Sequence, residues 1–254
     1  AAIATALSQC VSFAILLSCF LTGRTVTKPG IGKIPLRATD YLKSLKNGLP
    51  SFCRQGLASA ATVALNIAAA LYGDAAVAGM SIVGRIFMFI FAITLGIGQG
   101  YMPVVGYNYG ARRFDRVRTS FLFTFKVACA AMTTCAVLCF AFAPSIMRIF
   151  IETDPRVVEI GAKALRCISL AMPLVPLGVV CNMTFQSIGH AWTATFLSTA
   201  RQGIFFFPLI LILPGIIGLT GVQITQALAD ACTFLCCIPF ARRFFRTLDA
   251  TEKK

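Results

Sequence analysis

Long apolar runs separated by short polar segments fill the whole chain, which is the pattern of a membrane protein with several crossings. A transmembrane helix needs roughly 20 mostly apolar residues, and seven stretches meet that length. The predicted spans cover residues 2–22, 50–72, 77–107, 119–143, 164–188, 193–213 and 221–241. The predicted fold class is therefore all-α: a polytopic membrane helix bundle of about seven transmembrane helices.

Two of the uncharged runs are too long for one helix, and each contains a strong turn signal. Residues 167–200 are broken by Gly189-His190, and residues 202–229 are broken by Pro214-Gly215 followed by Gly218 and Gly221. Glycine and proline are the residues that most often end helices and form turns. Each of these two runs therefore predicts a pair of neighbouring, antiparallel helices.

Composition agrees with the membrane class. Hydrophobic residues make up 57% of the 254 residues and charged residues only 13%, about half of the roughly 25% typical of soluble domains. The formal net charge of +14 comes from basic residues at the ends of the apolar runs. They form no aromatic-interleaved basic patch on a soluble unit, so nucleic acid is not an expected partner.

The basic residues also predict orientation. They collect in three segments, residues 24–46, 112–118 and 242–254, which lie on one side of the membrane if every span crosses once. The positive-inside rule makes that side, and the C-terminus, cytoplasmic. We expect the basic residues to contact anionic lipid headgroups.

Cysteines and catalytic motifs point to neither a metal site nor an enzyme. The eleven cysteines lie in or beside apolar stretches without a CxxC pair, and His190 is the only histidine. There is no GxxxxGK[ST] or HExxH motif, and no further histidine to assist a nucleophile. The sequence predicts reduced cysteines, no metal, no cofactor and no catalytic residues.

Polar residues inside the spans recur on single helical faces. Polar side chains are costly in hydrocarbon, so such residues normally face water or a polar partner. Interhelical hydrogen bonding could account for any one stripe, whereas several stripes favour a shared, hydrated cavity. The candidates for its lining are Gln55, Ser59, Thr62 and Asn66 in the second span, Asn182 and Gln186 in the fifth, and Gln226 in the seventh.

Two charges lie deep in the sixth and seventh predicted spans. Asp230 is the only acidic residue deep within any span, and Arg201 lies at a similar depth in the preceding antiparallel span. Two isolated charges at that depth would each cost several kcal/mol, on the order of the penalty for a buried ion. We expect Arg201 and Asp230 to pair, as a structural latch or with a role in coupling.

A series of motifs, in order and spacing, resembles a known transporter family. A span opens with Gly48 and Pro50, then GDAAVAG follows from Gly73, and Pro103 precedes the segment GYNYGARRFDRVR at residues 106–118. This series, with its motif residues Asn108, Gly110 and Arg112, is similar to the second half of the multidrug and toxic compound extrusion (MATE) family, in its MepA-like bacterial branch.

The resemblance implies a fold of twelve helices in two six-helix lobes, one of the repeat types of secondary transporters. Residues 1–23 would be the last helix of the N-terminal lobe and residues 24–47 the cytoplasmic linker between the lobes. Residues 48–243 would form the six-helix C-terminal lobe, and residues 244–254 a cytoplasmic tail. The chain would then be a partial one, without most of its N-terminal lobe.

The resemblance also implies function: export of small organic cations across the bacterial inner membrane, coupled to inward H⁺ or Na⁺. Some branches carry acidic coupling residues on the first and fourth helices of the C-terminal lobe. Residues 50–72 and 164–188 contain no Asp or Glu, so coupling carboxylates are expected in the missing N-terminal lobe.

Two alternatives stay open on the sequence. A lipid-linked oligosaccharide flippase of the same superfamily would have a similar span pattern. A seven-helix receptor would match the number of spans, and Asp115-Arg116-Val117 follows the third span where such receptors carry an acidic-Arg-Tyr motif. The last span, however, contains no Asn-Pro-x-x-Tyr.

Overall fold

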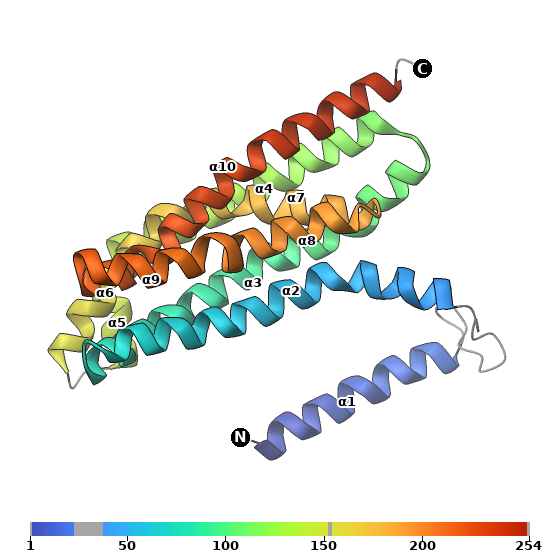
Figure 1. Ribbon diagram of the computed structural model, residues 1–254. Coiled ribbons are helices and arrows are strands. Elements are labelled where there is room, and N and C mark those ends of the chain that lie inside the picture. The colour runs from blue at the N-terminus through green and yellow to red at the C-terminus, as the bar shows by residue number, and fades with distance from the viewer. Residues whose placement is uncertain (1, 23–37, 152–153, 253–254) are drawn as a thin grey trace. The chain divides into compact units, whose positions relative to one another are not determined.

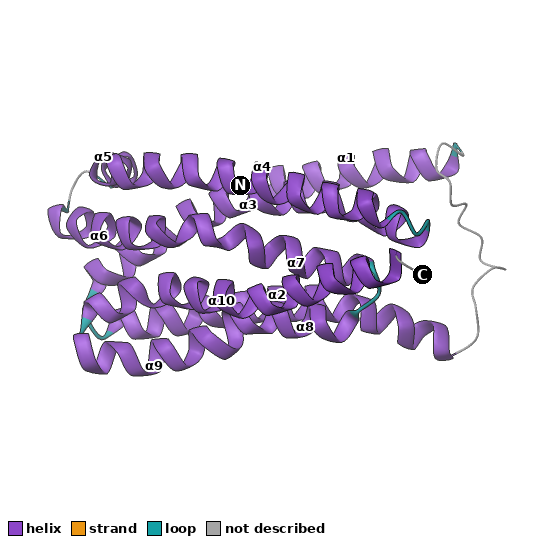
Figure 2. Ribbon diagram, turned by 90° about the horizontal axis from the view of Figure 1, so that it is seen from above, coloured by secondary structure: helices purple, strands orange, loops and turns teal. Residues whose placement is uncertain are grey.

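The computed structural model describes residues 2–22, 38–151 and 154–252, and these residues are almost entirely helical without a strand. The chain divides into two compact units, Ala1–Ser44 and Leu45–Lys254, which we call the first and second unit. Figure 1 shows the order of the helices along the chain, and Figure 2 their helical character in a second view.

The first unit contains helix α1 (Ala2–Leu21) and the first residues of α2 (Ala38–Ala70). Helix α1 coincides with the first predicted span, and its most apolar stretch is Ala6–Cys19. Residues 24–37 of the predicted linker lie outside the described residues. Helix α2 begins at Ala38 rather than near residue 50, because residues 38–47 are helical but too polar to be found in a search for apolar spans. The boundary between linker and lobe stays a prediction.

The second unit continues α2 and adds the rest of the bundle. Its elements are α3 (Asp74–Gly110), α4 (Phe114–Ala141), α5 (Ala143–Phe150), α6 (Pro155–Ala171), the 3₁₀ turn η2 (Met172–Leu174), α7 (Val175–Ser187), α8 (Ala191–Thr199), the π-helical turn η3 (Ala200–Phe205), α9 (Phe206–Ile217) and α10 (Leu219–Glu252).

Five helical segments of the described chain are long and apolar enough to cross a membrane. They correspond to the third to seventh predicted spans, and they confirm a polytopic helical bundle. The segments are Asp74–Gly110, Phe114–Ala141, Pro155–Ser187, Ala191–Ile217 and Leu219–Leu248.

The α6–η2–α7 segment is the central helix of this unit. In its most apolar window 61% of the residues are buried, against 17–28% for the other four segments. Pro173 and Pro176 lie where the helix changes to the η2 turn and starts again, because proline cannot donate a backbone hydrogen bond within a helix. The kink therefore divides the central helix near its middle.

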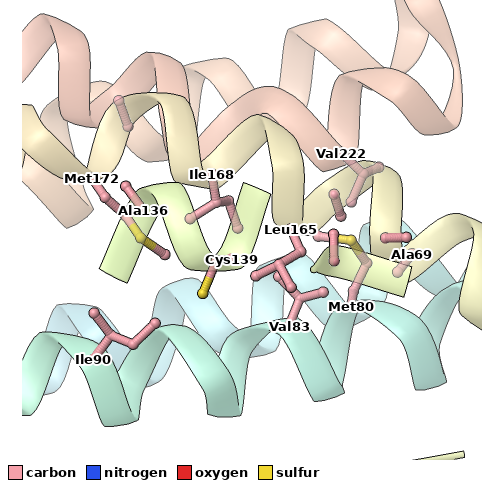
Figure 3. Close-up of a cluster of buried hydrophobic side chains, with 14 of the residues drawn as sticks. Ala69, Met80, Val83, Ile90, Ala136, Cys139, Leu165, Ile168, Met172 and Val222 are labelled. Carbon is pink, nitrogen blue, oxygen red and sulfur yellow. The ribbon is translucent and has the colours of Figure 1, made fainter. Parts of the chain in front are cut away.

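Small residues let the central helix approach α3 closely. A Cβ atom added at Gly79 would lie 3.3 Å from the backbone nitrogen of Gly161. The side chains around this contact form a continuous apolar core between α3, α4 and α6 (Figure 3). Its members include Met80, Val83, Ile90, Ala136, Cys139, Leu165, Ile168 and Met172.

The breaks between helices lie at two of the predicted glycines, whereas Pro214 and Gly215 lie within α9 and do not end it. Gly189 (φ 81°) separates α7 from α8, and Gly218 (φ 61°) separates α9 from α10. These left-handed conformations favour glycine, which has no Cβ to clash with the backbone. The segment at residues 106–118 covers the end of α3, a short turn at residues 111–113 and the start of α4, and Arg112 takes a left-handed φ of 55° in that turn.

Helix α5 was not predicted from the sequence. Pro144 lies at its first turn, and Phe142, Ile149 and Phe150 around it are exposed. Because residues 143–150 follow an apolar run without a polar break, hydrophobicity alone merges the start of α5 with the preceding span. A turn between α4 and α5 can only be seen in three dimensions.

Candidate functional site

A cavity of about 490 Å³ lies among α2, α3, the central helix, α8–η3 and α10 of the second unit. Its volume falls within the roughly 300–1,000 Å³ of typical small-molecule sites. Most of its wall is apolar, and a small set of polar and charged side chains interrupts it. The predicted polar stripes therefore share a cavity, formed by helices far apart in the sequence.

Five of the seven candidate lining residues contribute to this cavity: Gln55, Thr62, Asn66, Asn182 and Gln226. The other two have different contacts. The Ser59 hydroxyl donates to the Gln55 carbonyl at 3.2 Å, and Gln186 Nε2 donates to Ser51 Oγ at 3.0 Å. Ser59 hydrogen-bonds within its own helix, and Gln186 joins α7 to α2. Both residues therefore stabilise the helices and do not line the cavity.

Arg201 and Asp230 are brought together at the cavity wall. Arg201 Nε lies 2.6 Å from Asp230 Oδ1, and Arg201 Nη2 lies 3.4 Å from Asp230 Oδ2, so both carboxylate oxygens face the guanidinium. The side chain of Asp230 is 1% exposed and that of Arg201 14%. Gln226 Nε2 also donates to Asp230 Oδ1, at 3.1 Å. The buried carboxylate is therefore satisfied by two neighbours.

Aromatic rings cover the other side of Arg201. Its guanidinium carbon lies 4.5 Å from the ring centre of Phe91 and 5.3 Å from that of Phe87. Stacking of this kind holds a guanidinium within a partly desolvated site. Phe87 and Phe91 were not among the predicted site residues, although their spacing of four residues on one helical face is visible in the sequence.

Arg201 projects from η3, a π-helical turn within an otherwise α-helical segment. Residues 200–205 form this turn, and Gln202 on it also lines the cavity. π-helical turns often occur at functional sites, because the extra residue per turn changes the direction of the side chains. No sequence signal marks this turn.

Asn182 is held on the central helix by two hydrogen bonds that fix its orientation. Its Nδ2 donates to the Ala194 carbonyl at 2.5 Å and to Ser198 Oγ at 2.7 Å. Because the Ala194 carbonyl can only accept, the amide nitrogen must face it. The buried Oδ1 of Asn182 and the buried Oε1 of Gln202 have no hydrogen-bond partner among the described residues. Both residues line the cavity, and these two buried acceptors are unpartnered.

Two further cations line the cavity, and the sequence did not single them out for it. Arg54 comes from α2 and Arg85 from α3. Arg54 is half-buried and Arg85 is exposed. With three arginines and one aspartate in its lining, the cavity carries a net positive charge.

The family-motif residues lie elsewhere in the second unit. Gly48 and Pro50 lie on α2, where Pro50 is buried, and Pro103 lies within α3. The remaining three shape the α3–α4 turn: Asn108 donates its side-chain amide to the Val104 carbonyl at 2.8 Å, Gly110 ends α3, and Arg112 takes the left-handed conformation. These six residues shape helices and a turn, and none of them lines the cavity.

No group of three or more His, Cys, Asp or Glu side chains within the described chain could hold a metal ion. All eleven cysteines are free. Helix α6 begins at Pro155 and so includes one acidic residue, Glu159, that the predicted span omitted. Glu159 is exposed and lies outside the cavity lining.

The model of the MatE family matches residues 50–212, which is most of the second unit and more than half of the chain. The chain belongs to the MatE family. This membership rules out the seven-helix receptor alternative. The residues that resemble the family in the sequence lie largely within the matched region.

Curated relatives and a solved structure agree with this family. The chain is 26% identical over 191 residues to the multidrug export protein MepA of Staphylococcus haemolyticus (strain JCSC1435), covering 75% of this chain and 42% of the relative. It is 25% identical over 255 residues to MepA of Staphylococcus aureus (strain N315), covering 99% and 56%. A crystal structure of a MATE protein in complex with MaL6 superposes with a TM-score of 0.89 at 24% identity, covering 98% of this chain and 57% of that one.

The chain spans about half the length of the curated relatives that it matches. The structural likeness, at 24% identity, establishes the fold of the described part. The fold is that of a polytopic MATE helical bundle.

Proposed function

We propose that this chain is the C-terminal part of a secondary active exporter that moves small organic cations across the bacterial inner membrane in antiport with H⁺ or Na⁺. The cavity in the second unit carries the proposal, because α2 and four membrane-length helical segments of a MatE-family bundle enclose a drug-sized space. The similar MepA proteins are named multidrug export proteins, which supports the same activity.

The cavity offers a lipophilic cation mainly apolar contacts, since its three arginines outnumber its single aspartate. Apolar side chains make up most of the wall, and the side-chain oxygens of Gln55, Thr62 and Asn66 can accept hydrogen bonds from an ammonium or amine. Such a site binds many shapes because few directional contacts are required.

In this proposal, the residues that couple export to H⁺ or Na⁺ lie outside this chain. The one carboxylate at the cavity, Asp230, is bound by Arg201 and Gln226. A carboxylate that already has a guanidinium partner does not readily exchange a proton or Na⁺, since losing the partner leaves a buried charge. The basic segments of the chain face the cytoplasm in this proposal, with the C-terminus on the same side.

The test is transport by the full-length protein in proteoliposomes. With an imposed H⁺ or Na⁺ gradient, we expect ethidium to accumulate against its own concentration gradient. An ionophore that collapses the H⁺ or Na⁺ gradient should stop this accumulation. Equal ethidium movement in protein-free vesicles under both gradients would contradict the proposal. Inhibition by a lipid-linked oligosaccharide, with no ethidium movement, would favour the flippase alternative instead.

A further inference from the structure

The charges around the cavity do not balance within the second unit. Arg54, Arg85 and Arg201 line it together with a single carboxylate, Asp230. Arg201 donates two hydrogen bonds to the carboxylate of Asp230. Neither Arg54 nor Arg85 has an ion pair or hydrogen bond with any side chain that the structure describes.

The sequence offers these two arginines no other partner nearby. Between residues 48 and 243 the remaining acidic residues of the described chain lie at or near the ends of helices: Asp74, Asp115, Asp154 and Glu159. Arg85 follows the start of α3 by eleven residues, about 16 Å along the axis at the α-helical rise. That places it near the middle of a roughly 30 Å hydrocarbon core.

A guanidinium at this depth is expensive unless water or an anion accompanies it. Arg54 lines the same cavity, and two guanidinium groups at one cavity repel each other and lower its affinity for purely cationic ligands. A carboxylate, sulfonate or phosphate would relieve both costs, because arginine binds these groups with two parallel hydrogen bonds.

We propose that Arg54 and Arg85 form an anion-binding subsite of the cavity, which takes the carboxylate, sulfonate or phosphate of a ligand with an aromatic or apolar body. The apolar wall and the rings of Phe87 and Phe91 receive that body. A positive group elsewhere on the same ligand is compatible, since the side-chain amide oxygens of Gln55 and Asn66, which also line the cavity, can accept from it. The claim that such ligands are exported rests on the proposed export function. The claim that they bind at Arg54 and Arg85 does not.

The experiment measures equilibrium binding of radiolabelled 2-naphthoate to the purified full-length protein in detergent with phosphatidylcholine. The neutral isostere 2-naphthamide serves as the ligand control. We expect naphthoate to bind at least tenfold more tightly than naphthamide, and Arg54→Gln or Arg85→Gln to weaken naphthoate binding about tenfold, the scale of one hydrogen bond to a charged group. Neither substitution should change naphthamide binding.

Two variants keep the result interpretable. Arg116→Gln, an exposed basic residue in α4 outside the cavity lining, should leave naphthoate binding unchanged. Arg85→Lys keeps the charge and should retain more affinity than Arg85→Gln, even if the Gln variant unfolds more easily. Equal binding of naphthoate and naphthamide to the wild type, or unchanged naphthoate binding in both Gln variants, would overturn the subsite.

Phosphatidylglycerol distinguishes the two sources of an anionic group. If it displaces naphthoate where phosphatidylcholine does not, the subsite also accepts lipid headgroup phosphates; if it does not, the subsite selects soluble aromatic anions. Either result supports the subsite. Ethidium export is measured separately to test the proposed function. Intact export without selectivity for naphthoate would overturn only the anion-binding subsite. Intact selectivity without export would overturn only the proposed export function.

Discussion

At the scale of single residues, the Arg201–Asp230 contact organises one wall of the cavity. The carboxylate is almost fully buried and receives Arg201 Nε at 2.6 Å and Gln226 Nε2 at 3.1 Å. Removing one partner of such a pair leaves an uncompensated charge, which costs more than the pair itself contributes. The pair is therefore a sensitive point for the stability of the whole bundle.

We predict strong coupling between substitutions at these two positions. Arg201→Gln and Asp230→Asn should each lower the free energy of unfolding by about 3 kcal/mol, the usual cost of breaking a buried pair. The double variant should lose much less than the sum of the two, because it leaves no unpaired charge. Thermal unfolding in detergent of the two single variants, the double variant and the wild type measures the difference. Additive losses would show that the contact is not an energetic pair.

Only some of the residues at the cavity could be predicted from the sequence. The depth of Arg201 and Asp230 in adjacent antiparallel spans predicts their proximity, and helical spacing predicts that Gln55, Thr62 and Asn66 share a face. Whether a polar side chain faces the cavity or a neighbouring helix depends on helix rotation, which spacing does not determine. Gln186 shows this, since it shares the Asn182 face and yet hydrogen-bonds Ser51 on α2.

At the scale of elements, the turn between α9 and α10 shows how closely the helices are joined. A Cβ at Gly221 would lie 2.5 Å from the backbone carbonyl carbon of Leu213 and 2.7 Å from the nitrogen of Pro214. Both contacts are with backbone, which cannot rotate away as a side chain can. The close return of α10 on α9 therefore requires glycine at this position.

Gly221→Ala is expected to destabilise the protein by about 1–3 kcal/mol, the usual cost of an overpacked site. The matched control is Gly215→Ala in α9, where an added Cβ would meet no atom within 4 Å. That change should be neutral or stabilising by up to about 1 kcal/mol, since alanine favours a helix over glycine. A thermal shift measurement compares the two, and equal stabilities of both variants would contradict the described packing.

Long apolar segments could be predicted as elements, and their interruptions could be predicted in part. Gly189 and Gly218 mark turns because only glycine takes their backbone conformation readily. The π-helical turn at residues 200–205 could not be foreseen, because no residue type marks such a turn, and α5 could not because its apolar residues continue from the preceding span. Helix α2 starts early because residues 38–47, which are too polar to count as an apolar span, are already helical.

At the scale of the whole molecule, the described helices of the second unit form a MATE-type bundle with a cavity inside it. The described helices supply one buried carboxylate, already paired, and no second acidic residue at the cavity. An exporter driven by an ion gradient needs a group that binds the ion and releases it. In our proposal that group belongs to the other half of the full-length protein.

The polypeptide of residues 1–254 alone should therefore not transport. Reconstituted in vesicles under an H⁺ or Na⁺ gradient, it is expected to move ethidium no faster than protein-free vesicles do, while the full-length protein under the same conditions moves it. Ethidium accumulation by the 1–254 polypeptide above the level of empty vesicles would show that coupling resides within this chain.

The most direct test of the central claim, that export cargo occupies the cavity of the second unit, is to fill that cavity. Thr62 lines it from α2, whereas its neighbour Val63 is exposed and lies outside the lining. In the full-length protein, Thr62→Trp should reduce gradient-driven ethidium export at least tenfold, and Val63→Trp should leave it near the wild-type rate, with both variants equally stable. Equal export by the two stable variants would show that cargo does not pass through this cavity.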